Sequence, residues 1–450
     1  MAPPAIAGTG GGEVAISARR GTGEARGVGS APAEPCGQAG QGACISARKP
    51  AAKSRLAPWQ VVFLAVFACS WGGNHFSPLL LLYKEHQHYS TTVVNAFLGV
   101  YVFGIFPALL LAGGLSDRHG RKPLLRFGCI TGLLGSFCLA FSAFGPGWIY
   151  VGRLFSGMTV GVAMAVGSSW LKELSAPPHD PSADDTAGAR RASLAFLAGS
   201  ALGAMVAGMI AQLTPWGETL PFVLHFLLLA PLYFMLGRVP ETSLSGGMPG
   251  PFLRQFAVPS AAHRRFSRVV MLAAPWAFVA GSVAYGYMPV LLAGASGHWG
   301  LAYATLLTVV TLGCASLAQP LARRLDTPDS ARGVMVGVFI IAAGLVLAWA
   351  AVQAGSLPMG LATSVVLGAG LGICLLSGLL EVQRIANPRD LAGLTGVFYC
   401  VTYSGFLAPL VLSWIASFVA VGWVLVAVAT LALLTAFYLR VQYRKHLPVS

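Results

Sequence analysis

The sequence predicts an all-α membrane protein, with twelve transmembrane helices arranged as two pseudo-symmetric six-helix bundles. Of its 450 residues, 56% are hydrophobic and only 10% are charged, whereas a soluble domain carries roughly 25% charged residues. A surface so poor in charge would not stay in water, which excludes an ordinary soluble enzyme. The hydrophobic residues gather in runs long enough to cross about 30 Å of hydrocarbon as helices. In lipid, such runs must be helical so that their backbone groups are hydrogen-bonded.

The chain begins with a polar tail, residues 1–56, which is rich in Gly, Ala, Pro and Ser and contains no apolar run. Such a segment has too little apolar surface to fold by itself. It also lacks the apolar core of a signal peptide. We therefore expect a disordered cytoplasmic tail, to which we assign no function.

Twelve apolar runs follow the tail, and Arg153 is the only formally charged residue inside them. Each run is predicted to form one membrane-spanning helix. The runs are 59–82, 93–115, 127–144, 148–171, 192–213, 219–237, 269–293, 299–322, 333–353, 357–380, 391–416 and 418–439.

The longest internal connection divides these runs into six and six. We expect an N-terminal bundle at 57–238, a cytoplasmic linker at 239–268, a C-terminal bundle at 269–440 and a short cytoplasmic tail at 441–450. A division of this kind is typical of membrane proteins built from two parallel repeats.

The positive charges predict the orientation of the chain. Of the 29 Lys and Arg residues, 27 fall in segments predicted to be cytoplasmic, which leaves Lys84 outside and Arg153 within a span. This asymmetry follows the positive-inside rule and predicts a multi-pass protein with both termini in the cytoplasm. It also explains the net charge of +14 without a nucleic-acid partner. The excess of Arg over Lys suggests a bacterial plasma membrane.

The loop between the second and third runs reads GGLSDRHGRKPLL, starting at Gly113. Its two spaced glycines permit a tight turn, and Asp117 at a helix end can pair with a neighbouring Arg or with the positive end of another helix. The positive-inside rule alone would explain the basic residues of this loop but not Asp117. We predict a conformational latch formed by Gly113, Asp117, Arg118, Gly120, Arg121 and Lys122.

This loop resembles the G-x-L-a-D-r-x-G-r-k-x-x-l signature of the major facilitator superfamily of membrane transporters, with Ser116 as a conservative departure. The fourth run is similar to a second signature of the family, l-x-x-x-R-x-x-q-G, with Arg153 in place and Ser156 instead of Gln. Pro240-Glu-Thr resembles the family's ending of the sixth helix. The antiporter signature in the fifth run lacks its Pro and one Gly.

The resemblance covers roughly residues 59–242 and implies the family's fold of two six-helix bundles. It also implies an acidic partner for the latch at the cytoplasmic end of the fourth helix, where Glu173 lies. The implied activity is transport by alternating access, through a cavity lined by helices 1, 4, 7 and 10.

Polar and aromatic residues in these cavity helices are the candidates for solute binding. Trp71, Asn74 and His75 fall at i, i+3 and i+4, so they form either a binding face or a polar contact with a neighbouring helix. Arg153 either reaches the outer interface or faces the cavity. The substrate-cavity candidates are Trp71, Asn74, His75, Arg153, Trp276, Tyr285 and Tyr287.

The candidates for proton coupling are His75 and Arg153, because no Asp or Glu lies in any predicted run. A His can change its charge near neutral pH. Other polar residues, such as Asn95 and Gln212, are interpreted as hydrogen-bonding between bundles.

The leading hypothesis is a secondary active transporter that exports a small organic solute in exchange for protons. Uptake or facilitated diffusion of a metabolite is the alternative, and a non-transporting sensor or a membrane enzyme is a distant one. We expect the partners to be a small-molecule substrate, protons and the lipid bilayer. We expect a monomer with no enzymatic activity, no cofactor and no metal site.

Overall fold

A computed structural model describes most of the chain and is nearly all helical; among the described residues its only β-type contact is an isolated bridge between Thr327 and Ser330. This confirms the predicted fold class. The predicted disordered tail lies outside the described residues, except for Leu56. The described residues are 56–184, 187–243, 258–327, 329–387 and 391–445.

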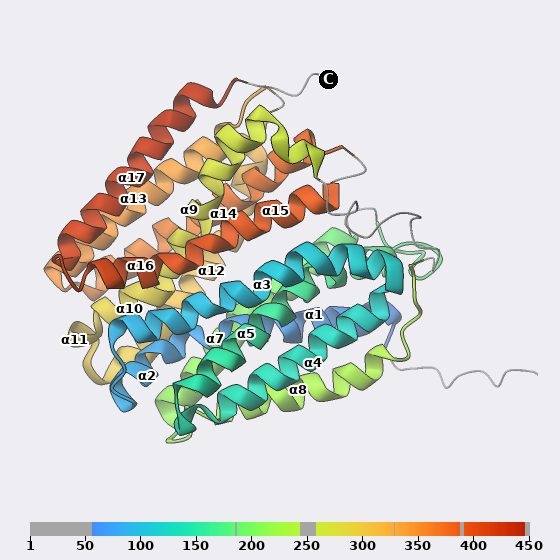
Figure 1. The fold of residues 1–450 in the computed structure, drawn as a ribbon, viewed down its shortest axis with the longest axis horizontal. Helices are drawn as coiled ribbons and strands as arrows, with labels where there is room; N and C mark the ends of the chain where they lie inside the picture. Colours follow the sequence, from blue (N-terminus) through green and yellow to red (C-terminus); the bar gives the residue numbers. More distant parts are fainter. Residues whose placement is uncertain (1–55, 185–186, 244–257, 328, 388–390, 446–450) are drawn as a thin grey trace, which may run out of the picture. The chain divides into compact units, whose positions relative to one another are not determined.

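Among the described residues, eight α-helices form the first half (Figure 1). They are α1 (Pro58–Asn74), α2 (Leu80–His86), α3 (Thr91–His119), α4 (Arg121–Ala140), α5 (Pro146–Val162), α6 (Ser168–Leu174), α7 (Ala187–Leu213) and α8 (Leu220–Leu236). A π-helical turn at Ala163–Gly167 joins α5 to α6, so the two form one span, Pro146–Leu174.

The described part of the second half contains nine α-helices. They are α9 (Met271–Gly281), α10 (Met288–Leu291), α11 (Ala293–Ser296), α12 (Gly300–Leu325), α13 (Arg332–Ala354), α14 (Leu357–Ile385), α15 (Leu391–Tyr403), α16 (Ala408–Ile415) and α17 (Val421–Gln442). A π-helical turn at Ser282–Tyr287 lies between α9 and α10, and Pro289 lies at the start of α10.

Ten helical segments of the described chain are long and apolar enough to cross a membrane. The predicted sixth run forms the shorter apolar helix α8, Leu220–Leu236. The predicted first run is divided between α1 and α2, with a 3-10 turn at Ser77–Leu79 between them. Pro78 lies in this turn, where it lacks the N–H that a continuous helix would need.

The helices of each half pack mainly on one another. In the first half, α5 packs on α3 and α4, and α1 packs on α7; in the second half, α14 packs on α12 and α13. Between the halves, α7 contacts α12, and α3 contacts α15 and α16. This arrangement agrees with two bundles, although the predicted bundle boundaries stay a prediction.

Small residues allow the closest of these helix crossings. A Cβ atom on Gly157 of α5 would lie 2.1 Å from the carbonyl oxygen of Tyr101 on α3, and one on Gly104 of α3 would lie 2.0 Å from the carbonyl oxygen of Leu154. Both distances are far below van der Waals contact. The α3–α5 crossing therefore depends on glycine on both helices, as in other membrane proteins.

We expect Gly157→Ala to destabilise the protein by about 1–3 kcal/mol or more, because the backbone of α3 must move away. Gly147→Ala, on the same helix, is the matched control, since no atom lies within 4 Å of the added Cβ. Thermal unfolding of the purified proteins and their elution in size-exclusion chromatography would measure the difference. Equal melting temperatures for the two variants would contradict the packing argument.

Candidate functional site

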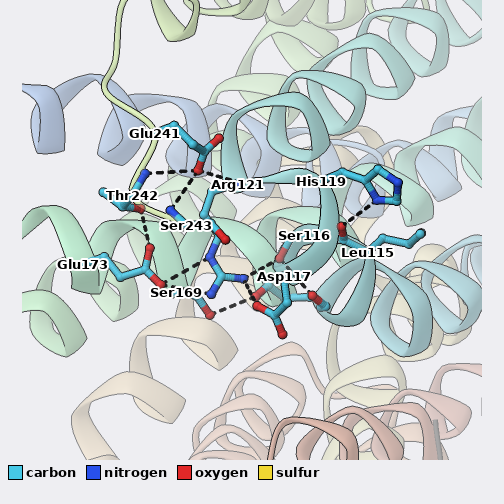
Figure 2. Close-up of polar contacts among 12 residues, drawn as sticks. Leu115, Ser116, Asp117, His119, Arg121, Ser169, Glu173, Glu241, Thr242 and Ser243 are labelled. Carbon is cyan, nitrogen blue, oxygen red and sulfur yellow. Dashed lines mark hydrogen bonds and ion pairs between the residues drawn. The ribbon is translucent and has the colours of Figure 1, made fainter. Parts of the chain in front are cut away.

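The loop between α3 and α4 forms a charge network centred on the guanidinium group of Arg121. Arg121 Nη1 lies 2.6 Å from Asp117 Oδ1, and its Nη2 lies 3.0 Å from Glu173 Oε1. Figure 2 shows Arg121 between these two carboxylates. Arg121 Nη1 also donates to Ser116 Oγ at 2.5 Å. The network therefore ties together the end of α3, the start of α4 and the end of α6, as predicted for Glu173.

Glu241, in the segment that follows α8, holds the first turn of α4. Its carboxylate accepts hydrogen bonds from the backbone N–H groups of Arg121 and Lys122, both at 2.9 Å. A carboxylate at this position satisfies free N–H groups and interacts favourably with the helix dipole. Thr242, the next residue, donates its hydroxyl to Glu173, so the segment after α8 joins the same network.

Gly120 is required at this turn for two reasons. Its φ of +99° is a conformation that residues with a side chain rarely adopt. A Cβ there would also lie 2.6 Å from Glu241 Oε2. The sequence contained both residues in signatures of the family, but nothing in their spacing showed that Glu241 approaches Gly120.

The remaining latch residues have different surroundings. Lys122 Nζ donates to the carbonyl of Gly237 at 3.4 Å. Arg118 lies in the last turn of α3, where a positive charge stabilises the helix end. Gly113 has open space around the position of a Cβ, so the structure shows no close contact that requires glycine there.

A pocket of about 510 Å³ opens beside the Arg121–Glu173 pair. Its wall includes the segment after α6, which Arg191 holds in place. Arg191 donates to Asp180 Oδ2 at 2.8 Å, and its guanidinium lies 3.6 Å from the centre of the Trp59 ring. Hydrogen bonds from Arg191 and Ser182 lower the pKa of the Asp180 carboxyl below its usual range.

The second half has a charge network of its own, which the sequence analysis did not predict. Arg265 and Glu381 form a buried ion pair, with Nε–Oε2 at 2.6 Å and Nη2–Oε1 at 3.1 Å. Their side chains are 0% and 2% exposed. Arg384 bridges Glu381 to Asp326, at 3.0 and 2.5 Å. The ends of α12 and α14 are thereby linked to the segment before α9.

The sequence analysis missed this network because it ended the tenth run at residue 380, whereas α14 continues to Ile385. Glu381 was therefore interpreted as a loop residue. The available signal was the spacing of Glu381 and Arg384, three residues apart and hence on one face of a helix. Arg265 was counted only as a positive charge of the linker.

Trp71 and Asn74, two predicted cavity residues, lie against α7. Asn74 Nδ2 donates to Ser200 Oγ at 3.0 Å, and Ser70 Oγ is 2.8 Å from the same atom. Trp71 packs directly on Gly203. Asn74 thus has the contact with a neighbouring helix that was one of its two interpretations, and it remains partly exposed.

His75, the residue that follows Asn74 at the end of α1, has different neighbours from Asn74. Its ring is completely buried and packs edge-on against Phe222 and His225 of α8, at 4.9 and 5.0 Å between ring centres. Neither ring nitrogen has a hydrogen-bond partner within the described part of the chain. His225 itself is within hydrogen-bond distance of Ser136 Oγ and the Ala68 carbonyl.

Arg153 is 1% exposed, so it does not reach the outer interface. It donates to the carbonyl of Phe97 at 3.2 Å and to the carbonyl of Gly73 at 3.3 Å. Its guanidinium also lies over the rings of Phe76 and Tyr101, 4.7 and 4.6 Å from their centres. The structure thus places Arg153 among α1, α3 and α5, and its role in a substrate cavity stays a prediction.

The three predicted cavity residues of the seventh run separate into two environments. Tyr285 joins the buried aromatic cluster that contains Phe76 and Tyr101. Trp276 and Tyr287 belong instead to the core of the second half. The structure therefore brings Tyr285 near Arg153 but does not gather all seven candidates at one place.

Gln212 forms the hydrogen bonds between halves that the sequence analysis predicted. Its Nε2 donates to the His298 carbonyl at 3.1 Å, and its Oε1 accepts from the Ala302 N–H at 3.0 Å. Asn95, for which the same role was predicted, is buried, and its side-chain amide has no partner among the described residues.

The fold and the charge networks are those of a multi-pass membrane protein. A family model described as "Major Facilitator Superfamily" matches residues 62–409. The chain belongs to this family, as the resemblance of its first half implied, and the family and fold are those of membrane transporters.

Solved structures of transporters share the fold. A POT family transporter in complex with 5-aminolevulinic acid superposes with a TM-score of 0.70 at 13% identity, over 87% of this chain and 96% of that one. A D-xylose-proton symporter gives a TM-score of 0.64 at 16% identity, over 87% and 97% of the two chains. At these identities the likeness shows the fold alone.

Among curated proteins, the chain is similar to "Quinolone resistance protein NorB" of Staphylococcus aureus. The two are 26% identical over 153 residues, which is 34% of this chain and 30% of that protein. The chain thus matches less than a third of the length of this relative.

We expect Glu381→Ala to lower stability by about 3–5 kcal/mol, because it leaves the buried Arg265 guanidinium without its carboxylate. Asp117→Ala is the matched control in the first half. The Asp117 side chain is 53% exposed, and the loss of such a pair costs about 0–1 kcal/mol. Thermal unfolding in detergent would compare the two variants.

The double variant Arg265→Met/Glu381→Met separates pairing from packing, because it removes both buried charges and keeps apolar side chains. It should be more stable than Glu381→Ala. A double variant as unstable as the single one would show that the unpaired charge is not the cause.

Proposed function

We propose that this protein is a secondary active transporter, a monomer in the bacterial plasma membrane, that exports a small organic solute by alternating access in exchange for protons. The observation that carries this proposal is the network around Arg121, which links α3, α4 and α6 at the end predicted to be cytoplasmic. Alternating access needs contacts at one end of the helices that form in one state and break in another.

The strength of the two networks suits different tasks. The Asp117 and Glu173 side chains are 53% and 34% exposed, and exposed ion pairs contribute about 0–1 kcal/mol each. Such pairs can exchange partners during a transport cycle. The Arg265–Glu381 pair is buried and would be costly to break, so we assign it to holding the second half together.

The position of α3 supports a latch between the halves. The N-terminal part of α15 packs on the C-terminal part of α3, where a Cβ on Gly396 would lie 3.3 Å from the Leu109 carbonyl oxygen. The two helices run in opposite directions, so the positive end of α15 points toward the Asp117 end of α3. We infer that Asp117, when released from Arg121, interacts with this helix end.

The buried aromatic cluster around Arg153 suits a solute with an aromatic or apolar body. Export rather than uptake of such a solute is supported by the partial similarity to a protein named for quinolone resistance. For proton coupling we retain His75 and Arg153 as candidates, since His75 is a buried titratable group whose ring nitrogens have no partner among the described residues.

We expect Asp117→Asn to lower the transport rate by up to about five-fold, because it removes a charge worth up to about 1 kcal/mol in the balance between states. Asp184→Asn is the control, since Asp184 forms a comparably exposed pair with Arg190. The assay would measure flux into proteoliposomes of three aromatic test solutes that differ in charge. They are the anion 2-naphthoate, the neutral 2-naphthamide and the cation 2-naphthylmethylammonium. Wild-type flux in Asp117→Asn with equal insertion would remove Asp117 from the latch.

Proton exchange predicts that vesicles with an acidic lumen accumulate the transported solute, and that an uncoupler abolishes the accumulation. Protein-free vesicles give the passive distribution to subtract. Accumulation driven by an acidic exterior would indicate proton-coupled uptake instead. Flux that ignores the gradient would indicate facilitated diffusion and would overturn the proposed coupling.

A further inference from the structure

Arg153 is a buried cation without a carboxylate partner in the described part of the chain. Within this part it contacts two backbone carbonyls and two aromatic rings. A guanidinium has five N–H donors in a planar fork that matches a carboxylate. Two carbonyl contacts leave part of this capacity unused, at a depth where an uncompensated charge is costly.

Two tyrosine hydroxyl groups near Arg153 also lack partners. Tyr101 and Tyr285 are 3% and 1% exposed and belong to one buried cluster, in which the Tyr101 ring centre lies 4.6 Å from the Arg153 guanidinium. Neither hydroxyl makes a hydrogen bond to any described residue, whereas the nearby Tyr83 hydroxyl donates to Ser142. A hydroxyl that makes no hydrogen bond within the protein can donate one to a bound acceptor.

The neighbourhood of these donors is aromatic and comes from both halves. Phe278 stacks on Tyr403 and Phe406, with ring centres 4.3 and 4.8 Å apart. Phe406 in turn lies 6.0 Å from the Tyr101 ring and 6.3 Å from the Tyr285 ring. These rings make the surroundings of the donors apolar and aromatic, which suits an aromatic solute.

We propose that Arg153, Tyr101 and Tyr285 bind the carboxylate of an aromatic organic acid, whose ring packs against Phe278, Tyr403 and Phe406. This inference rests on the proposed transport function and names its substrate class. All three polar groups can donate hydrogen bonds, and Arg153 adds a positive charge, so they select an anion over a neutral or cationic analogue. A carboxylate is planar and accepts two parallel hydrogen bonds from a guanidinium.

The test is direct binding to the purified full-length protein in nanodiscs, measured by calorimetry. The probes are 2-naphthoate and its neutral isostere 2-naphthamide. We expect naphthoate to bind at least ten-fold more tightly than naphthamide. Equal affinity of the wild-type protein for the two compounds, or no binding of naphthoate, would overturn the inference.

Tyr101→Phe and Tyr285→Phe each remove one hydroxyl and keep the ring. Each should weaken naphthoate binding about five- to ten-fold and leave naphthamide binding nearly unchanged. Tyr303→Phe is the matched control, because the Tyr303 hydroxyl donates to the Leu357 carbonyl in the second half. Naphthoate affinity unchanged in both test variants, or reduced equally in the control, would contradict the assignment.

Arg153→Gln separates anion binding from a purely structural role at the junction of α1, α3 and α5. Anion binding predicts that the preference for naphthoate over naphthamide disappears, whereas a structural role predicts an equal loss for both compounds. If this variant does not fold, the two Tyr→Phe variants decide the question. Selective naphthoate binding without flux would support the inference and refute the proposed transport. Flux without a preference for naphthoate would support the proposed transport and refute the inference.

Discussion

A charged side chain in a membrane-spanning protein is tolerated only where other groups replace the water that it loses, and this constraint organises the structure. Three guanidinium groups replace the lost water in three different ways. Arg121 lies at the helix ends between two partly exposed carboxylates. Arg265 is completely buried against the equally buried Glu381. Arg153 has only carbonyl oxygens and aromatic rings around it among the described residues.

We expect the helices joined by these guanidinium groups to differ in how freely they move. A buried, doubly hydrogen-bonded pair is lost only at a large cost, so the helices that it joins are expected to move as one unit. A partly hydrated network such as that of Arg121 can lose one contact and keep the others, with water replacing what is lost. The second half therefore contains a buried ion pair and the first half a partly exposed charge network.

The sequence predicted the features that depend on local pattern, and it failed where distant segments meet. The helical spans follow from run length, and the Arg121–Glu173 contact followed from a family signature. The contacts of Glu381 with Arg265 and of Glu241 with Arg121 could not be predicted from the sequence, because the partners lie more than 100 residues apart. Asn74 and His75 were assigned to one face from their spacing to Trp71, which could not show that Asn74 contacts α7 whereas His75 packs on α8.

A single span connects Arg153 to the charge network around Arg121. Arg153 lies on α5, and the same span, Pro146–Leu174, continues through the π-helical turn into α6, which carries Glu173. Such turns are frequent at functional sites. A ligand shifts a conformational equilibrium only if it binds the two states differently. A solute that contacts Arg153 on the first half and Tyr285 on the second meets this condition, because its two contacts can form together only when the halves are close. The span could then convey that difference to Glu173, and through Glu173 to the contacts of Arg121.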